Sequence, residues 1–557
     1  MVILIGCIAL GVIGICYFCF YYQKQEQLIK YLRLKWGQEI TRDYTYNEFE
    51  NIKMYWELKS KIALEEEGSS YIDELTWNDL DMDEVFTRIS HTESIIGESY
   101  LYDRLHYLHF DVKELEEFEK YVNVMDENET IRLSIQSRLS QFDKGTWNGI
   151  PLYLFKVDEK SSYYKPIYGM MGILPIISLL SLLSDVKLGM LLVVAMMVVN
   201  GCIHYKYARS LSYEMDGLNA VYLLLKCAKK ISMLQEDSLS PICRELKENC
   251  SKLESILSLE GRFFLSTNTD LGILQEYLGI ITLSHLRIHH KFLTLLKKET
   301  KALQNIYAIL GMLESSIAVA SYRRSVDYWC TPTFGTDKTL EVEELYHPLI
   351  EDPVSHSVKL TKNAIITGSN ASGKSTFVKS LAINGILGQS IHTVLAERFV
   401  APLSYYMTSM AISDNILTDE SYYIAEIRSL KRIIDAIQHY PFCICFIDEI
   451  LKGTNTIERI AASSAILKHL NTLNCLCLSA SHDIELTQML ENSYHNYHFR
   501  EIIEDSQIKF DYKIYKGPST TRNAIKLLEV MNYDESIIYD ANHLASYFST
   551  HQIWLKL

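Results

Sequence analysis

Residues 368–376 have the types and spacing of a phosphate-binding loop, G-x-x-x-x-G-K-[ST]. Gly368 and Gly373 let the backbone turn its N–H groups towards phosphate oxygens. The Lys374 ammonium can then reach the β- and γ-phosphates, and the Ser375 hydroxyl can ligate Mg²⁺. We therefore predict a site for ATP and Mg²⁺, in which the nucleotide contacts Gly368, Ser369, Asn370, Ala371, Ser372, Gly373, Lys374, Ser375 and Thr376.

Two acidic residues end an apolar, strand-like run over residues 442–449. The Asp448 carboxylate suits Mg²⁺ held through water, and Glu449 suits a general base or the positioning of an attacking water. A strand ending in two acids is also common as the start of a loop. Because a phosphate-binding loop precedes this run in the chain, we interpret it as the metal-binding and catalytic strand of an ATPase.

A histidine follows another apolar run, residues 474–482. A lone histidine is usually structural. His482, however, closes a predicted parallel strand at the edge where α/β sheets bind their ligands. We therefore predict that His482 senses the γ-phosphate and takes part in catalysis.

These residues need a parallel sheet to bring them together, and the sequence predicts one. Residues 363–367 are short, apolar and β-branched, as in a strand, and residues 377–384 continue with helical spacing. Beyond Pro332 the chain alternates short apolar runs with turns and helical segments. We predict an α/β domain over residues 333–557, preceded by a mainly helical core and lever region.

Composition restricts the partners without excluding a local contact with nucleic acid. A net charge of −15 argues against non-specific coating of nucleic acid. The 12 cysteines show no zinc-type pairing, and pairs such as Cys443 and Cys445 alternate inside apolar runs, where cysteine behaves as a small hydrophobe. These cysteines suit a reducing cytoplasm.

Three uncharged apolar segments predict membrane-spanning helices. Residues 1–22 lack a basic leader and a cleavage site, so we expect an uncleaved anchor. Residues 166–205 contain two apolar segments around the polar turn 184–187, which predicts a transmembrane hairpin. Basic residues flank both regions, so we expect the N-terminus outside and the ATPase domain inside, in a multi-pass protein of the cell membrane. The alternative for the second region is a buried helical hairpin of a soluble core.

The segments between the predicted spans have the periodicity of amphipathic helices. Residues 23–165 are expected to form a cytoplasmic helical region, and residues 206–332 its second, lever-like part. No ionisable residue lies in the middle of a predicted span, so the sequence does not indicate a transport path.

Further segments combine with the glycine loop into one ordered pattern. In chain order they are 345–349 (LYHPL), 368–376, 421–426 (SYYIAE), 446–456 (FIDEILKGTNT), 479–482 (SASH), 510–517 (FDYKIYKG) and 523–528 (NAIKLL). In this order and spacing they resemble the ATPase domain of the MutS mismatch-repair family. Residues 76–105 are similar, more weakly, to the start of that family's helical core.

The resemblance implies an ABC-type P-loop ATPase in which two copies of the chain face each other and enclose two nucleotides. Ser421 then belongs to the signature segment that reaches the γ-phosphate bound by the partner, so a homodimer is expected and a monomer should be nearly inactive. A hydroxyl supplied in this way stabilises transferred charge only when the dimer closes. The alternative for Ser421 is an ordinary helix cap.

The sequence also departs from the family pattern. The usual glycine-arginine pair after the catalytic acids is Leu451-Lys452 here, and no N-terminal segment resembles the mismatch-reading domain. Two downstream roles stay open. One is binding of mismatched or branched DNA, as the family implies, and the other is an ATP-driven membrane scaffold or mechanoenzyme without DNA.

Overall fold

The computed structural model describes residues 2–40, 42–64, 70–142, 144, 149–159, 165–258, 277–369, 372–410, 422–504, 507–519, 524–531, 533–551 and 553–556. The chain forms two compact units, which we name the helical unit and the α/β unit. The helical unit comprises Met1–Glu67, Ile89–Arg104 and Glu117–Ser325; the α/β unit comprises Gly68–Arg88, Leu105–Glu116 and Val326–Leu557.

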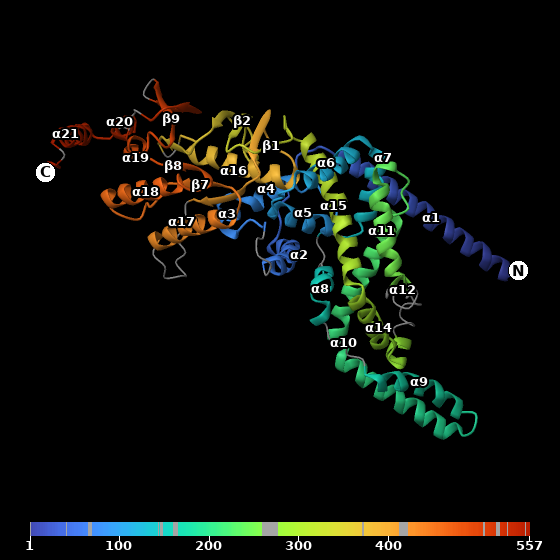
Figure 1. Cartoon of the computed structure of the whole chain (residues 1–557). Coiled ribbons are helices and arrows are strands. Elements are labelled where there is room, and N and C mark those ends of the chain that lie inside the picture. The colour runs from blue at the N-terminus through green and yellow to red at the C-terminus, as the bar shows by residue number, and fades with distance from the viewer. Residues whose placement is uncertain are drawn as a thin grey trace. The chain divides into compact units, whose positions relative to one another are not determined.

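The helical unit is built on α15 (Thr300–Arg324), whose side chains are buried along most of its length (Figure 1). Leucine and isoleucine at positions such as Leu303, Leu310 and Ile317 are fully buried, so apolar burial holds the unit together. The other helices that lie wholly or partly in this unit are α1 (Val2–Lys35), α2 (Tyr46–Leu64), α5 (Ile95–His106), α6 (Val112–Glu127), α7 (Glu129–Leu139), α8 (Ile150–Phe155), α9 (Pro166–Ser181), α10 (Val186–Ile231), α11 (Ser240–Lys252), α12 (Glu254–Leu257) and α14 (Ser284–Lys298).

Two helices in the described part of the chain are long and apolar enough to cross a membrane, the Val186–Tyr207 part of α10 and α15. The apolar window of α15 is 78% buried, so α15 is a core helix, whereas that of α10 is only 11% buried. The helix α9 is apolar but shorter, and most side chains of the predicted anchor 1–22 lie outside the described residues. The structure therefore does not confirm three transmembrane helices.

The predicted hairpin is present as α9 and the first part of α10, which lie side by side (Figure 1). Asp185 begins α10 by accepting hydrogen bonds from the N–H groups of Lys187 and Leu188, as a capping residue does. Asn200 is fully buried, and its side-chain amide donates to the carbonyl oxygens of Met171 at 3.0 Å and Ile281 at 2.5 Å. The helix that carries the second apolar segment continues beyond residue 205 to Ile231.

The α/β unit contains a six-stranded sheet with the order β10-β9-β4-β8-β7-β6. Neighbouring strands from β9 to β6 pair in parallel, and only β10 is antiparallel. A second sheet has the order β1-β5-β2-β3. The strands are β1 (Thr333–Gly335), β2 (Leu340–Leu345), β3 (His356–Leu360), β4 (Ala364–Thr367), β5 (Arg398–Pro402), β6 (Tyr405–Ser409), β7 (Cys443–Asp448), β8 (Cys475–Ala480), β9 (His495–Glu504) and β10 (Gln507–Lys516).

The central strands β4, β7 and β8 are almost entirely buried, which explains why their sequences are continuous apolar runs. The predicted α/β domain is confirmed. The helices of this unit are α3 (Glu74–Asp79), α4 (Met82–Ile89), α16 (Lys374–Ile391), α17 (Tyr422–His439), α18 (Thr456–Leu470), α19 (Ile484–Met489), α20 (Ala524–Val530) and α21 (Glu535–His551).

An N-terminal segment, residues 70–88, belongs to the α/β unit although more than two hundred residues separate it from the sheet. Asp79, at the end of α3, accepts hydrogen bonds from the Thr408 hydroxyl at 2.6 Å and from the Met410 N–H at 3.0 Å. Asp73, the cap of α3, pairs with Arg432 of α17. The segment therefore fixes α17 and the end of β6.

Candidate nucleotide-binding site

The glycine loop lies between β4 and α16, as predicted. Gly368 and Gly373 have φ angles of +144° and +99°, which other residues rarely adopt. A Cβ atom on Gly368 would lie 2.8 Å from the carbonyl oxygen of Phe499, so a larger residue is excluded there. Asn370 and Ala371 lie outside the described residues. The helix α16 begins at Lys374, so its free N–H groups point to the site.

Lys374 closes the loop on itself. Its Nζ atom donates to the carbonyl oxygens of Gly368 at 2.6 Å and Ser369 at 2.7 Å. Burial lowers the pKa of Lys374 to about 8, while the charge of Asp448 opposes this shift. A triphosphate would offer the ammonium stronger acceptors than these carbonyls.

The strand β7 brings the two predicted acids to the end of the sheet. The Oδ1 atom of Asp448 is buried and has no hydrogen-bond partner among the residues that the structure describes. An orphaned carboxylate oxygen fits a ligand of Mg²⁺, directly or through water, and Ser375 supplies a second oxygen in the first turn of α16. These residues fit the predicted metal.

Glu449 follows Asp448 in a turn whose backbone conformation is uncommon. Its φ angle is +56°, and that of Leu451 is +58°. Such conformations cost about 1–3 kcal/mol each and often occur at functional sites. The Glu449 N–H donates to the carbonyl of Ala480 at 2.9 Å, which ties the turn to β8. Its carboxylate lies 2.5 Å from Nζ of Lys452.

His482 lies beside Glu449, with 3.8 Å between its Nδ1 atom and the carboxylate. The imidazole is 45% exposed, so it can meet a ligand. Partial burial lowers the pKa of His482, while the charge of Asp483 opposes the shift; the ring is therefore neutral at pH 7 and can donate one hydrogen bond. Arg459 binds Asp483 through two hydrogen bonds of 2.7 and 3.0 Å, which holds the loop behind the ring.

The structure thus brings Glu449 and His482 together and places Lys374 in the electrostatic reach of Asp448. It does not place Ser421, which lies outside the described residues; α17 begins at Tyr422, directly after it. The roles of these residues in catalysis stay predictions.

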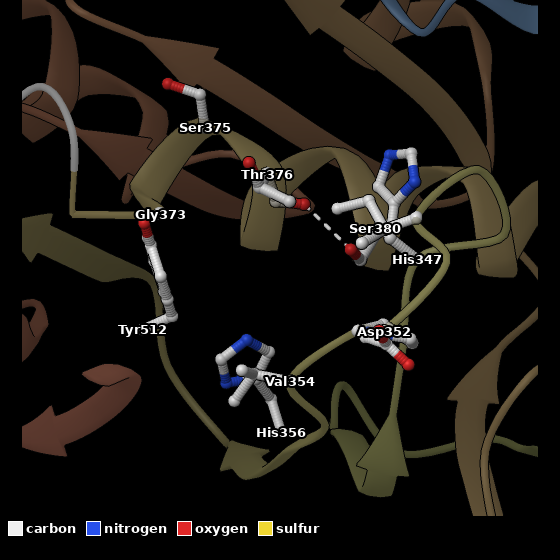
Figure 2. A pocket seen from close by; sticks show the side chains of 11 residues that line it. His347, Asp352, Val354, His356, Gly373, Ser375, Thr376, Ser380 and Tyr512 are labelled. Carbon is white, nitrogen blue, oxygen red and sulfur yellow. Dashed lines mark hydrogen bonds between the residues drawn. The ribbon is translucent and has the colours of Figure 1, made fainter. Parts of the chain in front are cut away.

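A cavity of 390 Å³ adjoins the glycine loop (Figure 2). Its size falls in the usual range for small-molecule sites. Burial lowers the pKa of His347 and of His356 to about 4, so both rings are neutral. Residues that line the cavity include His347, Asp352, His356, Ser375, Thr376 and Tyr512.

Tyr512 is one of the residues of this cavity that the sequence pattern does not single out. It comes from a bulge in β10, where its φ angle is +51°, and its ring lies 3.2 Å from where a Cβ on Gly373 would be. Only the pairing of distant strands brings it to the loop. The segment 510–517 resembles the family pattern, but its spacing does not mark the tyrosine itself.

A parallel sheet whose central strands end in a glycine loop, two acids and a histidine defines a P-loop nucleotide-binding domain. Residues 364–549 match the family model of MutS domain V. This part of the chain is therefore similar to MutS domain V.

Curated proteins show the same similarity. Proteins named DNA mismatch repair protein MutS match from Streptococcus uberis, with 24% identity over 42% of this chain and 29% of the relative, and from Streptococcus sanguinis, with 27% identity over 45% and 30%. The MutS of Natronomonas pharaonis is 27% identical over 44% of this chain and 29% of its own length. The match thus spans less than a third of each relative.

Proposed function

We propose that the protein is a Mg²⁺-dependent ATPase of the MutS type that is held at a membrane. The observation that carries the catalytic part is the convergence of a glycine loop, the orphaned Asp448 carboxylate and the Glu449–His482 pair at the end of one parallel sheet. Tyr512 and His347, which line the adjoining cavity, offer aromatic faces for a base.

In this mechanism Lys374 leaves the carbonyls of its own loop and binds the β- and γ-phosphates. Asp448 and Ser375 would hold Mg²⁺, which would neutralise phosphate charge. Glu449 orients a water molecule and accepts its proton as the oxygen bonds to the γ-phosphorus. The bond between the γ-phosphorus and the oxygen that bridges it to the β-phosphate breaks, so ADP and phosphate form. The neutral His482 donates a hydrogen bond to a γ-phosphate oxygen.

A second copy of the chain completes the site in this proposal, with its Ser421 at the γ-phosphate. The proposal is supported by the family and by the exposure of Lys452 and His482, whose side chains are 35% and 45% accessible on the catalytic face. A surface that carries catalytic groups and stays open suits closure by a partner.

The membrane part of the proposal is carried by the hairpin of α9 and α10. Its apolar window in α10 spans 22 residues, or about 33 Å of helix, close to the hydrocarbon thickness of a bilayer. Apolar side chains are exposed around both helices, which water disfavours and lipid does not. Examples are Ile167, Met170, Ile177, Leu180, Leu191 and Val198.

DNA is the partner that the name of the relatives suggests, and we propose mismatched or branched duplex as the ligand. A scaffold or mechanoenzyme without DNA is the second candidate, which the exposed hairpin favours. Binding measured over a range of salt concentrations separates the two roles. A DNA-binding protein gives a steep fall of log K with log salt, and the scaffold gives no saturable binding.

The experiment that tests the catalytic proposal compares Lys374→Ala with Lys379→Ala, in full-length protein in lipid nanodiscs. Both lysines lie on α16, but Lys379 pairs with Asp81 at 2.6 Å, away from the loop. We expect Lys374→Ala to abolish Mg²⁺-dependent ATP hydrolysis and Lys379→Ala to keep it. Full turnover by the Lys374 variant would refute the assignment.

A further inference from the structure

One buried carboxylate joins α17 to the turn that carries Glu449. Glu426 is only 6% exposed, and its two oxygens accept hydrogen bonds from successive backbone N–H groups. Oε1 accepts from Lys452 at 3.2 Å, and Oε2 accepts from Gly453 at 3.5 Å. Both contacts are long for hydrogen bonds, but together they hold two neighbouring N–H groups on one buried carboxylate.

The turn after β7 is held in two halves. Its first half is fixed by the hydrogen bond from Glu449 N–H to Ala480 and by the buried side chains of Ile450 and Leu451. Its second half, Lys452 and Gly453, lies on the surface. Glu426 is the buried acceptor that binds this exposed half. Because the turn contains two non-glycine residues with positive φ, it needs such support to persist.

Lys452 is bonded at both ends. Its backbone N–H binds Glu426, and its ammonium lies 2.5 Å from the Glu449 carboxylate. The position of the Glu449 side chain therefore depends on where Glu426 holds the Lys452 backbone.

The helix α17 is also held further along, at Arg432, which pairs with Asp73 and donates to the carbonyl of Thr408 at the end of β6. Glu426 lies nearer the start of the helix than this contact. A shift of the first turns of α17 would therefore pull on the Lys452–Gly453 half of the turn, while the middle of the helix stays on β6.

We propose that Glu426 is a positioning residue for Glu449 and that it transmits displacement of α17 to the hydrolytic site. The inference rests on the proposed ATPase function and deepens it. A partner that docks against the first turns of α17 would move Glu426, and with it the Lys452–Glu449 pair. The site would thus gain or lose its base without a change in the glycine loop that binds the nucleotide.

The test compares Glu426→Ala and Glu426→Gln with Asp435→Asn in full-length protein. Asp435 is a matched control, because it lies on the same helix and pairs with Lys431 on the surface. We expect Glu426→Ala to lower kcat by about tenfold to a hundredfold, as misplaced catalytic groups do, and to leave KM for ATP within about twofold. Glu426→Gln keeps one acceptor oxygen, so its kcat should lie between those of Glu426→Ala and the wild type. The kcat of Asp435→Asn should match that of the wild type.

Amide hydrogen exchange gives a readout that does not need hydrolysis. The N–H groups of Lys452 and Gly453 should exchange faster in Glu426→Ala than in the wild type, while the peptide that contains Lys374 is unchanged. Equal exchange at these two groups, or an unchanged kcat in a folded Glu426→Ala protein, would overturn the inference. A parallel fall of kcat, nucleotide affinity and melting temperature in Glu426→Gln would show a merely structural role. If the wild-type protein showed no ATP hydrolysis that Lys374→Ala abolishes, the ATPase proposal would be rejected. The exchange data would still show whether Glu426 holds the N–H groups of Lys452 and Gly453.

Discussion

Two carboxylates with buried oxygens, Glu314 in the helical unit and Asp448 in the α/β unit, differ in how these oxygens are bonded. In the helical unit, Glu314 of α15 is fully buried, and both of its carboxylate oxygens are used: Oε1 accepts from the N–H groups of Glu93 at 2.6 Å and Ser94 at 2.8 Å, and Oε2 accepts from the Ser94 hydroxyl. In the α/β unit, Asp448 keeps a buried oxygen without a described partner, and Lys374 donates to two carbonyl oxygens of its own loop.

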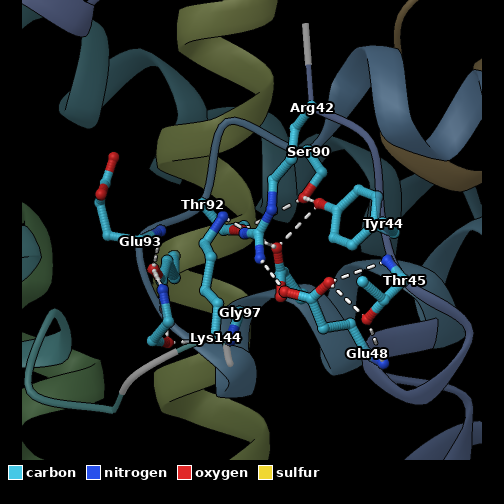
Figure 3. Close-up of polar contacts among 12 residues, drawn as sticks. Arg42, Tyr44, Thr45, Glu48, Ser90, Thr92, Glu93, Gly97 and Lys144 are labelled. Carbon is cyan, nitrogen blue, oxygen red and sulfur yellow. Dashed lines mark hydrogen bonds and ion pairs between the residues drawn. The ribbon is translucent and has the colours of Figure 1, made fainter. Parts of the chain in front are cut away.

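Figure 3 shows a network of polar contacts in the helical unit. Oε1 of the buried Glu98 receives hydrogen bonds from Tyr44 at 2.8 Å and Arg42 at 3.3 Å, and Lys144 lies 2.8 Å away. Such networks fix the packing of helices. Charges that are left partly unsatisfied, as at Asp448, are more often places for a ligand. Oε2 of Glu98 also has no partner among the described residues, but its Oε1 already pairs with Arg42 and Lys144, whereas Asp448 lies within the electrostatic reach of Lys374 in the glycine loop. We therefore predict a structural role for Glu314 and Glu98 and a chemical role for Asp448 and Glu449.

The largest expected effect tests the chemical side of this comparison. Glu449→Gln removes the base but keeps the shape of the side chain, so kcat should fall at least about a hundredfold, or roughly 3 kcal/mol in the barrier. Nucleotide binding, measured with a fluorescent ATP analogue, should stay within about twofold. Glu458→Gln is the control, since this acid lies exposed in the first turn of α18. If the Glu449 variant turned over at the wild-type rate, Glu449 would not be the base.

The sequence predicts those residues of the site that a short, local pattern marks. The glycine loop, the two acids and His482 each end an apolar run, so a short window of sequence predicts both the strand and the residue after it. Tyr512 and Glu426 could not be found in this way, because their roles arise from contacts between segments that are distant in the chain. Membership of residues 70–88 in the α/β unit also depends on such contacts.

Hydropathy alone does not distinguish a helix buried in the protein core from an apolar helix that is exposed. The helix α15 has a mean hydropathy of 1.3 and the Val186–Tyr207 part of α10 has 2.2, and both pass the test for a membrane span. What differs is the share of the window that is buried, 78% against 11%. A sequence pattern shows that a helix is apolar, but only packing shows whether protein covers it.

The second effect tests the structural side. Glu314→Ala leaves the N–H groups of Glu93 and Ser94 and the Ser94 hydroxyl without their acceptor in a buried place. We expect the free energy of unfolding to fall by about 2–4 kcal/mol. Chemical denaturation followed by helical circular dichroism measures this loss, and ATP hydrolysis at a temperature well below the transition should persist. If Glu314→Ala were as stable as the wild type but inactive, Glu314 would have a catalytic role, and the contrast drawn between Glu314 and Asp448 would be wrong.

The third effect concerns pH. Burial raises the pKa of Glu314 to about 7 from an ordinary value of 4.5. The folded state then binds more protons than the unfolded state between these values, so stability falls as pH rises from about 4.5 to 7 and is level above. Glu314→Gln can keep the hydrogen bonds without titrating, so this part of the slope should vanish. Identical slopes in both proteins between pH 5 and 7, each measured by denaturant midpoint, would contradict the raised pKa.

The smallest effect tests the cavity beside the loop. Tyr512→Ala removes a ring that can stack on a base, and the affinity for ATP should fall roughly fivefold, or about 1 kcal/mol. Inorganic tripolyphosphate has no base, so its affinity should not change, and Tyr512→Phe should bind ATP like the wild type. Equal losses for ATP and tripolyphosphate would mean that Tyr512 supports the loop at Gly373, which its ring approaches, and does not bind the base. The two ligands therefore separate a contact with the nucleotide from packing against the loop, which is the same distinction between chemistry and structure at the scale of one side chain.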